Sequence, residues 1–190
     1  RCYFNDFFWI NWHKKKMNKF ILSLPIIFIV VISLFLIIFL VQNKDPSKPP
    51  SSLLNENLPK FKLNNLFDDN DSLSNEYFKN KITLINFFAS WCGPCKAEHP
   101  LFFEIKKEYN DLFILGIDMQ DETVDAIKFL NADGNPYDFV GVDKFGFVAV
   151  EFGVVGLPET FLVNSEGKII YKYLGPLTKE IITNEIKPLL

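Results

Sequence analysis

Residues 84–95 read Leu-Ile-Asn-Phe-Phe-Ala-Ser-Trp-Cys-Gly-Pro-Cys and join an apolar run to a pair of cysteines. The run Ile82–Phe88 is almost continuously apolar, as is typical of a strand that is buried on both faces. The residues that follow, Pro94–Tyr109, predict a helix in which Pro100 is a kink. The pattern therefore places Cys92 between the end of a buried strand and the start of a helix.

That position predicts that Cys92 is a nucleophile. The free N–H groups of a first helical turn and the positive end of the helix dipole stabilise a thiolate and lower the pKa of a thiol there. Cys95 lies one turn later on the same face, and Gly93 and Pro94 let the chain turn tightly into the helix. We expect Cys92 to attack a client disulfide and Cys95 then to attack Cys92, which releases the reduced client.

Three other uses of such a cysteine pair are less favoured. A zinc site needs more ligands than Cys92, Cys95 and His99 supply, and no second cysteine pair exists. Covalent haem attachment needs His directly after the second cysteine, where this chain has Lys96. A purely structural disulfide closing so short a loop stabilises little. Because the third cysteine, Cys2, is remote, we expect a redox-active disulfide and neither a metal nor another cofactor.

Strand-like and helix-like segments alternate through the rest of the domain. In order, the sequence predicts a strand at 61–63, a turn at 68–71, a strand at 112–117, a helix at 122–131, a strand at 138–142, a short helix at 145–152, strands at 159–163 and 168–174 joined by a turn at 164–167, and a helix at 179–186 with Thr178 as N-cap. This order predicts an α/β sandwich around a mixed sheet.

An apolar segment precedes the domain. Residues 21–41 contain no charged side chain, and a helix of that length reaches about 30 Å, enough to cross a bilayer core. Basic residues lie mostly before it and no small-residue cleavage pattern follows it. Residues 17–42 therefore predict an uncleaved signal anchor that leaves the N-terminus in the cytoplasm and exports the rest. A buried core helix is the alternative.

The remaining boundaries follow from composition. Met17 is the expected natural start, so residues 1–16 are interpreted as an upstream or non-native segment. Residues 43–58 are rich in Pro and Ser and predict a flexible linker, which leaves 59–190 as the globular domain. After residue 20, the chain carries fifteen Lys against twenty-two acidic residues, so no nucleic-acid partner is expected.

Two motifs carry a family resemblance. Residues 91–95, Trp-Cys-Gly-Pro-Cys, resemble the active site of thioredoxin. Residues 153–161 read Gly-Val-Val-Gly-Leu-Pro-Glu-Thr-Phe and are similar to a signature of the DsbE/CcmG family, TlpA-like thiol:disulfide interchange proteins of cytochrome c biogenesis. Residues 84–92, 95–100 and 134–137 also match that family. The resemblance implies a thioredoxin-like fold with an N-terminal hairpin and a central insert, preceded by one transmembrane helix.

The resemblance also implies roles for single residues. Pro158 should follow a cis peptide bond and face the cysteines. The backbone groups there, next to Thr160, should then point toward an extended client strand. Glu98 and Glu159 match acidic residues that line the family's active-site groove, and their alternative reading is as plain surface carboxylates. Trp91 should shield the disulfide, although an aromatic residue at this position could equally serve packing alone.

Asn86 occupies a position where thioredoxins carry a buried Asp that can take the proton of the second thiol. The DsbE/CcmG family shares this Asn, so the substitution supports the resemblance but leaves the proton acceptor for Cys95 open. We expect Glu159 to take that proton and Glu98 to adjust the local field.

The implied function is that of a protein-disulfide reductase in the bacterial inner membrane, with one span at 21–41 and the C-terminal domain in the periplasm. It would receive electrons from a membrane thiol transporter of the DsbD/CcdA kind. It would keep the haem-binding cysteines of apocytochrome c reduced, acting on that protein or on a haem-lyase component. The alternatives are a general membrane-tethered thiol reductase, which the Gly-Pro dipeptide favours, a non-catalytic assembly module, and a disulfide oxidase.

Overall fold

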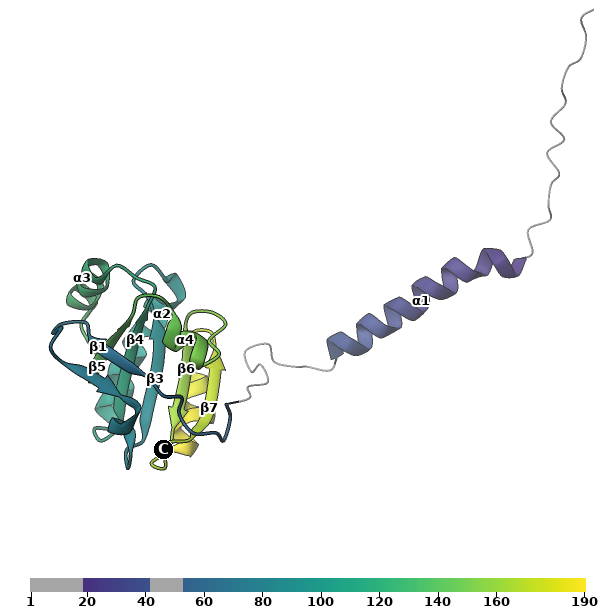
Figure 1. Cartoon of the computed structure of the whole chain (residues 1–190). Coiled ribbons are helices and arrows are strands. Elements are labelled where there is room, and N and C mark those ends of the chain that lie inside the picture. The colour runs from purple at the N-terminus through teal and green to yellow at the C-terminus, as the bar shows by residue number, and fades with distance from the viewer. Residues whose placement is uncertain (1–18, 42–52) are drawn as a thin grey trace, which may run out of the picture. The chain divides into compact units, whose positions relative to one another are not determined.

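The computed structural model describes residues 19–41 and 53–190 (Figure 1). Helix α1 (Lys19–Val41) and the domain from residue 53 onward belong to separate compact units. In these two ranges, no helix combines the length and the hydropathy that crossing a membrane requires. The span predicted for 21–41 therefore stays a prediction. Residues 1–16 and most of the predicted linker lie outside the described residues.

One seven-stranded sheet organises residues 53–190, with the strand order β2-β1-β5-β4-β3-β6-β7 (Figure 1). The strands are β1 (Lys62–Asn65), β2 (Ser72–Ser74), β3 (Thr83–Phe88), β4 (Phe113–Met119), β5 (Phe139–Asp143), β6 (Glu159–Val163) and β7 (Ile169–Leu174). Strands β3, β4 and β5 run parallel to one another, and every other neighbouring pair is antiparallel. The predicted mixed sheet is confirmed, and β1 and β2 form the predicted N-terminal hairpin.

Helical segments cover both faces of the sheet. They are η1 (Asn75–Phe78), α2 (Gly93–Glu108), α3 (Thr123–Asp133), α4 (Phe147–Glu151), α5 (Lys179–Ile181), a π-helical turn (Ile182–Ile186) and a 3₁₀ turn (Lys187–Leu189). One face packs against α2, α3 and the C-terminal helical turns, with Cys92 and Cys95 in its core, and we call it the cysteine face. The other, here called the opposite face, packs against η1, α4 and residues 58–61.

Strand β3 lies at the centre and is buried at all six positions, which confirms the expectation of burial on both sides. Its side chains alternate, because successive residues of a strand point to opposite sides of the sheet. Leu84 and Phe88 lie in the core of the cysteine face, whereas Ile85 and Phe87 lie in that of the opposite face. Asn86 therefore projects toward the cysteine face.

The central insert is part of the sheet. Strand β5 lies between β1 and β4 and pairs with β4 in parallel, and α4 then returns the chain to β6. Gly116 of β4 faces the ring of Tyr137, which precedes β5, so closely that a Cβ added there would lie 2.8 Å from it. The absence of a side chain at Gly116 lets Tyr137 lie flat beside β3, where it stacks on Phe88 at 5.1 Å.

The domain starts earlier than the predicted linker boundary. The N–H of Asn55 donates to the carbonyl of Ile169 at 2.7 Å, and Asn57 forms an isolated bridge with Lys168. Leu58 is 8% exposed and packs in the core of the opposite face. Residues 53–58 thus belong to the fold, because the start of β7 offers them backbone partners.

The last predicted helix is only partly regular. Thr178 caps it as predicted, since its hydroxyl accepts a hydrogen bond from the N–H of Ile181 at 3.3 Å. After Ile181 the helix widens into the π-helical turn and ends in the 3₁₀ turn. Ile182 and Ile186 from this segment are buried in the core of the cysteine face.

Candidate functional site

The two cysteines lie at the start of helix α2, shortly after the end of strand β3. Cys92 is the N-cap residue of α2 and forms a disulfide with Cys95, with their Cα atoms 5.3 Å apart. The Cys92 Sγ atom also accepts a hydrogen bond from the N–H of Cys95 at 3.2 Å. Both residues are nearly buried, at 4% and 3% exposed. The sequence-based placement of Cys92 at the start of a helix is therefore confirmed.

The residues flanking the buried cysteines are exposed. Trp91 is 61% exposed, and its Nε1–H donates to the carbonyl of Gln120 at 3.2 Å. Gly93 has open space where a side chain would lie, and Pro94 occupies the first turn of α2, where a missing N–H costs nothing. Trp91 thus stands beside the disulfide, anchored by its ring nitrogen rather than packed in the core.

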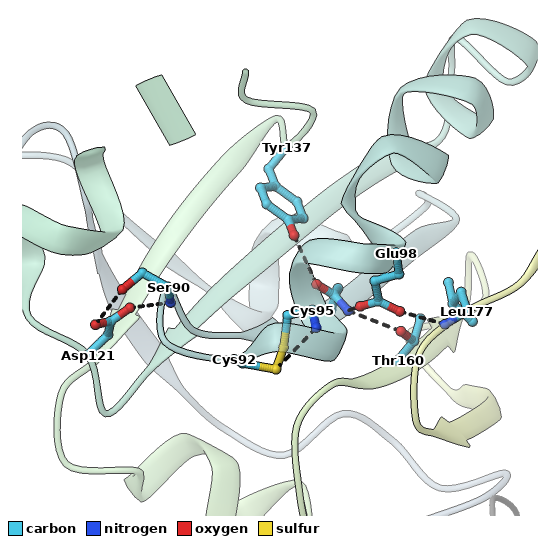
Figure 2. The surroundings of a disulfide bond; sticks show 9 residues. Ser90, Cys92, Cys95, Glu98, Asp121, Tyr137, Thr160 and Leu177 are labelled. Carbon is cyan, nitrogen blue, oxygen red and sulfur yellow. Dashed lines mark hydrogen bonds between the residues drawn. A yellow bond between two sulfur atoms is a disulfide. The ribbon is translucent and has the colours of Figure 1, made fainter. Parts of the chain in front are cut away.

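Asn86 is the centre of a buried hydrogen-bond network on the cysteine face, and Figure 2 labels its partners Glu98, Thr160 and Tyr137. Its Nδ2 donates to Glu98 Oε1 at 2.8 Å and to Thr160 Oγ1 at 3.2 Å. Its Oδ1 accepts from the hydroxyl of Tyr137 at 2.9 Å. Four side chains from β3, α2, β6 and the loop before β5 are therefore held in one arrangement next to the redox disulfide.

Glu98 is the ionisable member of this network nearest in sequence to Cys95, one helical turn further along α2. It is 1% exposed, and its Oε2 accepts a hydrogen bond from the N–H of Leu177 at 2.6 Å. Burial raises the pKa of Glu98 to about 7, although the hydrogen bonds from Leu177 and Asn86 act in the other direction. The reading of Glu98 as a surface carboxylate is wrong, and the group titrates near neutral pH.

Glu159 lies elsewhere, which corrects its expected role as the proton acceptor for Cys95. Its side chain shares the opposite face with Phe161, while Thr160 between them points to the cysteine face. There, Glu159 Oε1 lies 2.7 Å from Lys172 Nζ, and its Oε2 accepts from the N–H of Val155 at 2.9 Å. Glu159 is fully buried and paired with a cation on the other side of the sheet.

Pro158 directly precedes β6 and follows a cis peptide bond, as predicted. It is buried, and its carbonyl accepts a hydrogen bond from the N–H of Gly175. Its neighbour Leu157 packs against the core that contains both cysteines. The structure thus brings the Pro158 loop to the core of the cysteine face, and its contact with a client stays a prediction.

Sequence reasoning gave no role to two residues that contact its candidate residues: Tyr137, which bonds Asn86, and Lys172, which pairs with Glu159. Tyr137 lies in the segment 134–137 that matches the family, but the sequence pattern gives it no role of its own. Asn86, the polar residue within the apolar run 82–88, is the signal that a hydrogen-bonding partner such as the Tyr137 hydroxyl is required. No sequence pattern distinguishes Lys172, because it occupies an ordinary strand position. Only the pairing of β6 with β7 places it against Glu159.

The described residues contain no cluster of three or more His, Cys, Asp or Glu side chains suited to a metal ion. His99, which the zinc reading required, is 2% exposed and its Nε2 lies 2.9 Å from the carbonyl of Gly134. The imidazole ring also packs against Phe129 at 4.8 Å. His99 therefore has a packing role beneath α2.

A disulfide at the start of a helix, a cis-proline loop and a mixed sheet covered on both faces define a thioredoxin-fold thiol:disulfide oxidoreductase. A family model described as Redoxin matches residues 53–187. Thiol:disulfide interchange protein HelX of Rhodobacter capsulatus is 36% identical over 152 residues, which cover 80% of this chain and 85% of that protein. Thiol:disulfide interchange protein DsbE of Allochromatium vinosum is 32% identical and covers 84% of this chain and 88% of its own length.

Solved structures agree. A thiol-disulfide oxidoreductase from Bacteroides fragilis superposes with a TM-score of 0.60 at 28% identity, covering 71% of this chain and all of the other. The chain therefore belongs to the DsbE family of thiol:disulfide interchange proteins within the Redoxin group. Its activity is thiol:disulfide exchange.

Proposed function

We propose that this chain is a periplasmic, membrane-anchored reductase that keeps the haem-binding cysteines of apocytochrome c reduced before haem attachment. One observation carries the proposal: the disulfide Cys92–Cys95 stands next to a buried carboxylate, Glu98, that titrates near neutral pH. The motif around Pro158 and the Asn at position 86, both of which resemble DsbE/CcmG proteins, support the choice of client.

The exchange consists of two displacements. In the reduced protein, the Cys92 thiolate attacks one sulfur of the client disulfide, and the other client sulfur leaves as a thiolate. Cys95 then loses its proton and attacks Cys92 Sγ, so that the Cys92–Cys95 disulfide forms and the second client sulfur leaves. The client gains two electrons and the protein becomes oxidised. A membrane dithiol transporter would reverse the process and restore the dithiol.

Glu98 is the group best placed to accept the proton of Cys95. It lies one turn from Cys95 on the buried side of α2, and a base with a pKa near the working pH is the most effective proton acceptor. Replacing Glu98 by Gln should slow the second displacement by about 10²-fold, the lower end of the usual range for such groups. Stopped-flow decay of a preformed mixed disulfide at Cys92 measures that step directly.

Glu159→Gln is the matched control, because Glu159 is equally buried but lies on the opposite face. Its mixed-disulfide decay should match that of the unmodified protein. Equal slowing in both variants would remove Glu98 from the proton transfer.

The same carboxylate favours the reducing direction. A negative charge near the cysteines disfavours thiolates, and stabilised thiolates are what make strongly oxidising members of this fold oxidising. We therefore expect the reduction potential of the Cys92–Cys95 pair to lie near about −270 mV rather than about −120 mV. Equilibration with glutathione or dithiothreitol redox buffers measures it, and a value at the upper end would make the protein an oxidase.

Client identity is tested by trapping. A full-length Cys95→Ser variant can complete the first displacement but not the second, so its clients stay attached to Cys92. Mass spectrometry of the trapped species should recover apocytochrome c or a haem-lyase component. Recovery of many unrelated exported proteins would instead support the general reductase, the reading favoured by the Gly-Pro dipeptide between the cysteines.

Membrane anchoring rests on the uncharged segment 21–41 and on the basic residues before it. Fractionation of cells expressing the full chain should place it with membranes after carbonate extraction. Added protease should degrade the domain in spheroplasts but not in intact cells. Release by carbonate, or protection in spheroplasts, would contradict the proposed anchor and orientation.

A further inference from the structure

A second set of contacts reaches the redox disulfide from the side away from Glu98. Asp121, in the loop after β4, accepts hydrogen bonds from both the backbone N–H and the hydroxyl of Ser90, the latter at 3.0 Å (Figure 2). The preceding residue in that loop, Gln120, accepts the hydrogen bond of the Trp91 ring through its carbonyl. The two residues before Cys92 are thus both tied to residues 120–121.

The loop that makes these contacts is itself held in place. Gln120 adopts a left-handed backbone with φ 50°, a conformation that a non-glycine residue keeps only where its surroundings enforce it. Its N–H donates to the carbonyl of Asp143 at 3.1 Å, and Asp121 Oδ1 also accepts from the N–H of Glu122 at 2.8 Å. The loop is therefore a fixed support and not an incidental surface contact.

A buried carboxyl group stands behind Asp121. Asp118, near the end of β4, is 1% exposed, and no backbone or side-chain N–H of the described residues reaches either of its oxygens. Asp121 follows it by three residues, and the charge of Asp121 and a side-chain hydrogen bond with Asp121 both raise the pKa of Asp118, after burial. Two adjacent carboxyl groups can bond only if one carries a proton, because a carboxylate has no donor.

We propose that Asp121 is a positioning residue for Cys92, held in its orientation by a proton shared with Asp118, so that the Ser90–Trp91 segment presents the Cys92 sulfur for attack on a disulfide. The proposal deepens the function given above but rests only on the exchange chemistry of Cys92, whatever the client is. It explains why Asp118 is buried without a cation partner among the described residues.

The protonation state of Asp118 determines whether Asp121 holds Ser90 in place. Burial, and then the neighbouring charge of Asp121, raise the pKa of Asp118 to about 8. Below that pH, Asp118 is a neutral donor to Asp121. Above it, two adjacent carboxylates repel each other and loosen the hold on Ser90. The nucleophile should therefore lose its alignment near pH 8, in addition to the titration of its own thiol.

Other charged groups surround the pair. Tyr137 lies near Asp118, and its own pKa is raised well above the usual value, first by burial, so it stays protonated across the range tested. Glu98 acts on the same tyrosine from α2, and burial raises the pKa of Glu98 to about 7. Lining the pocket beside Asp121 are Glu122, Asp125 and Lys144. Because burial also raises the pKa of Glu98 to about 7, Glu98 receives a separate control.

The test measures alkylation of Cys92 by iodoacetamide between pH 5 and 10 in the full chain carrying Cys95→Ser and Cys2→Ser. Quantifying the Cys92 peptide by mass spectrometry gives the rate constant per thiolate. We expect this constant to fall about tenfold above pH 8, as misplacement of a reacting atom commonly does. Adding Glu98→Gln should leave the fall in place, whereas its disappearance there would assign it to Glu98.

Two substitutions at Asp118 separate positioning from mere folding. Asp118→Asn keeps an N–H donor toward Asp121 at every pH, so the fall near pH 8 should vanish while the rate stays high. Asp118→Leu removes the donor, so the constant should be about tenfold lower throughout. If the rate constants of Asp118→Asn and Asp118→Leu depend on pH in the same way, the proposal is overturned. A purely structural role would need only a side chain of similar volume at position 118, with or without a donor.

Substitutions at the other end of the contact complete the test. Asp121→Asn should lower the constant about tenfold at all pH values, and Ser90→Ala by less, because its backbone N–H donor remains. Asp125→Asn, in the same pocket but without a contact to Ser90, should match the parent. An Asp121→Asn profile equal to that of Asp125→Asn would refute the role of Asp121.

Discussion

The two faces of the sheet each bury a glutamate, and they use it in opposite ways. On the cysteine face, Glu98 has hydrogen-bond donors but no cation partner among the described residues, and burial raises its pKa to about 7. On the opposite face, Glu159 lies 2.7 Å from the ammonium group of Lys172 among phenylalanine rings. The comparison teaches that two equally buried glutamates can be stabilised in different ways, one by neutral hydrogen-bond donors and the other by an ammonium group.

The largest expected effect comes from removing the nucleophile. Cys92→Ser should abolish reduction of a model protein disulfide, because a hydroxyl does not replace a thiolate in disulfide exchange. Cys2→Ser, at the remote cysteine, should leave turnover unchanged. Residual turnover in the Cys92→Ser protein would mean that the chemistry is not confined to the cysteine face.

Lys172→Met should be the most destabilising single change on the opposite face. It leaves the Glu159 carboxylate buried without a partner, which typically costs about 3–5 kcal/mol of unfolding free energy. Denaturant unfolding of the oxidised protein measures this loss. Turnover of the folded fraction should stay near that of the unmodified protein.

The double variant Glu159→Leu with Lys172→Met is the control for that loss. It removes both charges together and should recover most of the stability. Failure of the second change to recover stability would point to lost packing of the Lys172 stem instead of an unpaired charge.

Glu98 should make stability fall as the pH rises. Its carboxyl group titrates at about 4.5 when exposed in the unfolded chain and at about 7 in the fold, so folding favours the protonated form. The contribution is complete below pH 4.5 and is lost between about pH 4.5 and 7, by about 3 kcal/mol at most. Asp118 acts in the same direction, from its ordinary value to about 8.

Unfolding free energies at pH 5 and pH 7.5 are compared between variants, because Asp118 titrates over the same range as Glu98. The difference between the two pH values should shrink in Glu98→Gln by about 2 kcal/mol and persist in Glu104→Gln, an exposed glutamate on the same helix. An unchanged difference in Glu98→Gln would show that the buried carboxyl group does not titrate in this range.

The smallest predicted effect concerns Tyr137→Phe. The change removes one hydrogen bond to Asn86 Oδ1 within the buried network and should cost about 1 kcal/mol. Tyr77→Phe, at a half-exposed tyrosine, should cost less. A larger effect of Tyr77→Phe on the unfolding free energy would argue against the network as a stabilising element of the cysteine face.

Much of this architecture was readable from local patterns. The apolar run ending at Phe88 predicted a doubly buried strand because only an interior strand tolerates apolar side chains on both sides. The Gly-Pro spacing put Cys92 at a helix start, and the turn at 164–167 predicted the hairpin of β6 and β7. Each of these depends on neighbours within a few residues, which the chain order already contains.

Local patterns could not predict on which side of the sheet each acidic residue lies. Glu98 and Glu159 both sit in recognisable motifs, and motif resemblance assigned both to one groove. The alternation of β6 and its register with β3 send Glu159 to Lys172 and leave Thr160 facing Asn86. Register is a long-range property, so local patterns do not show that Glu159 lies on the face of the sheet opposite Cys95.

For the redox centre, then, the residues between 84 and 95 suffice to place a cysteine at a helix start and to predict that it is a nucleophile, because helix capping and thiolate chemistry are local. The partners of that centre come from distant parts of the chain: Glu98 with Asn86 and Tyr137 on one side, Asp121 with Ser90 on the other. Only packing brings these groups together and buries them. Burial is what moves the pKa of a carboxyl group into the range where it can serve the reaction.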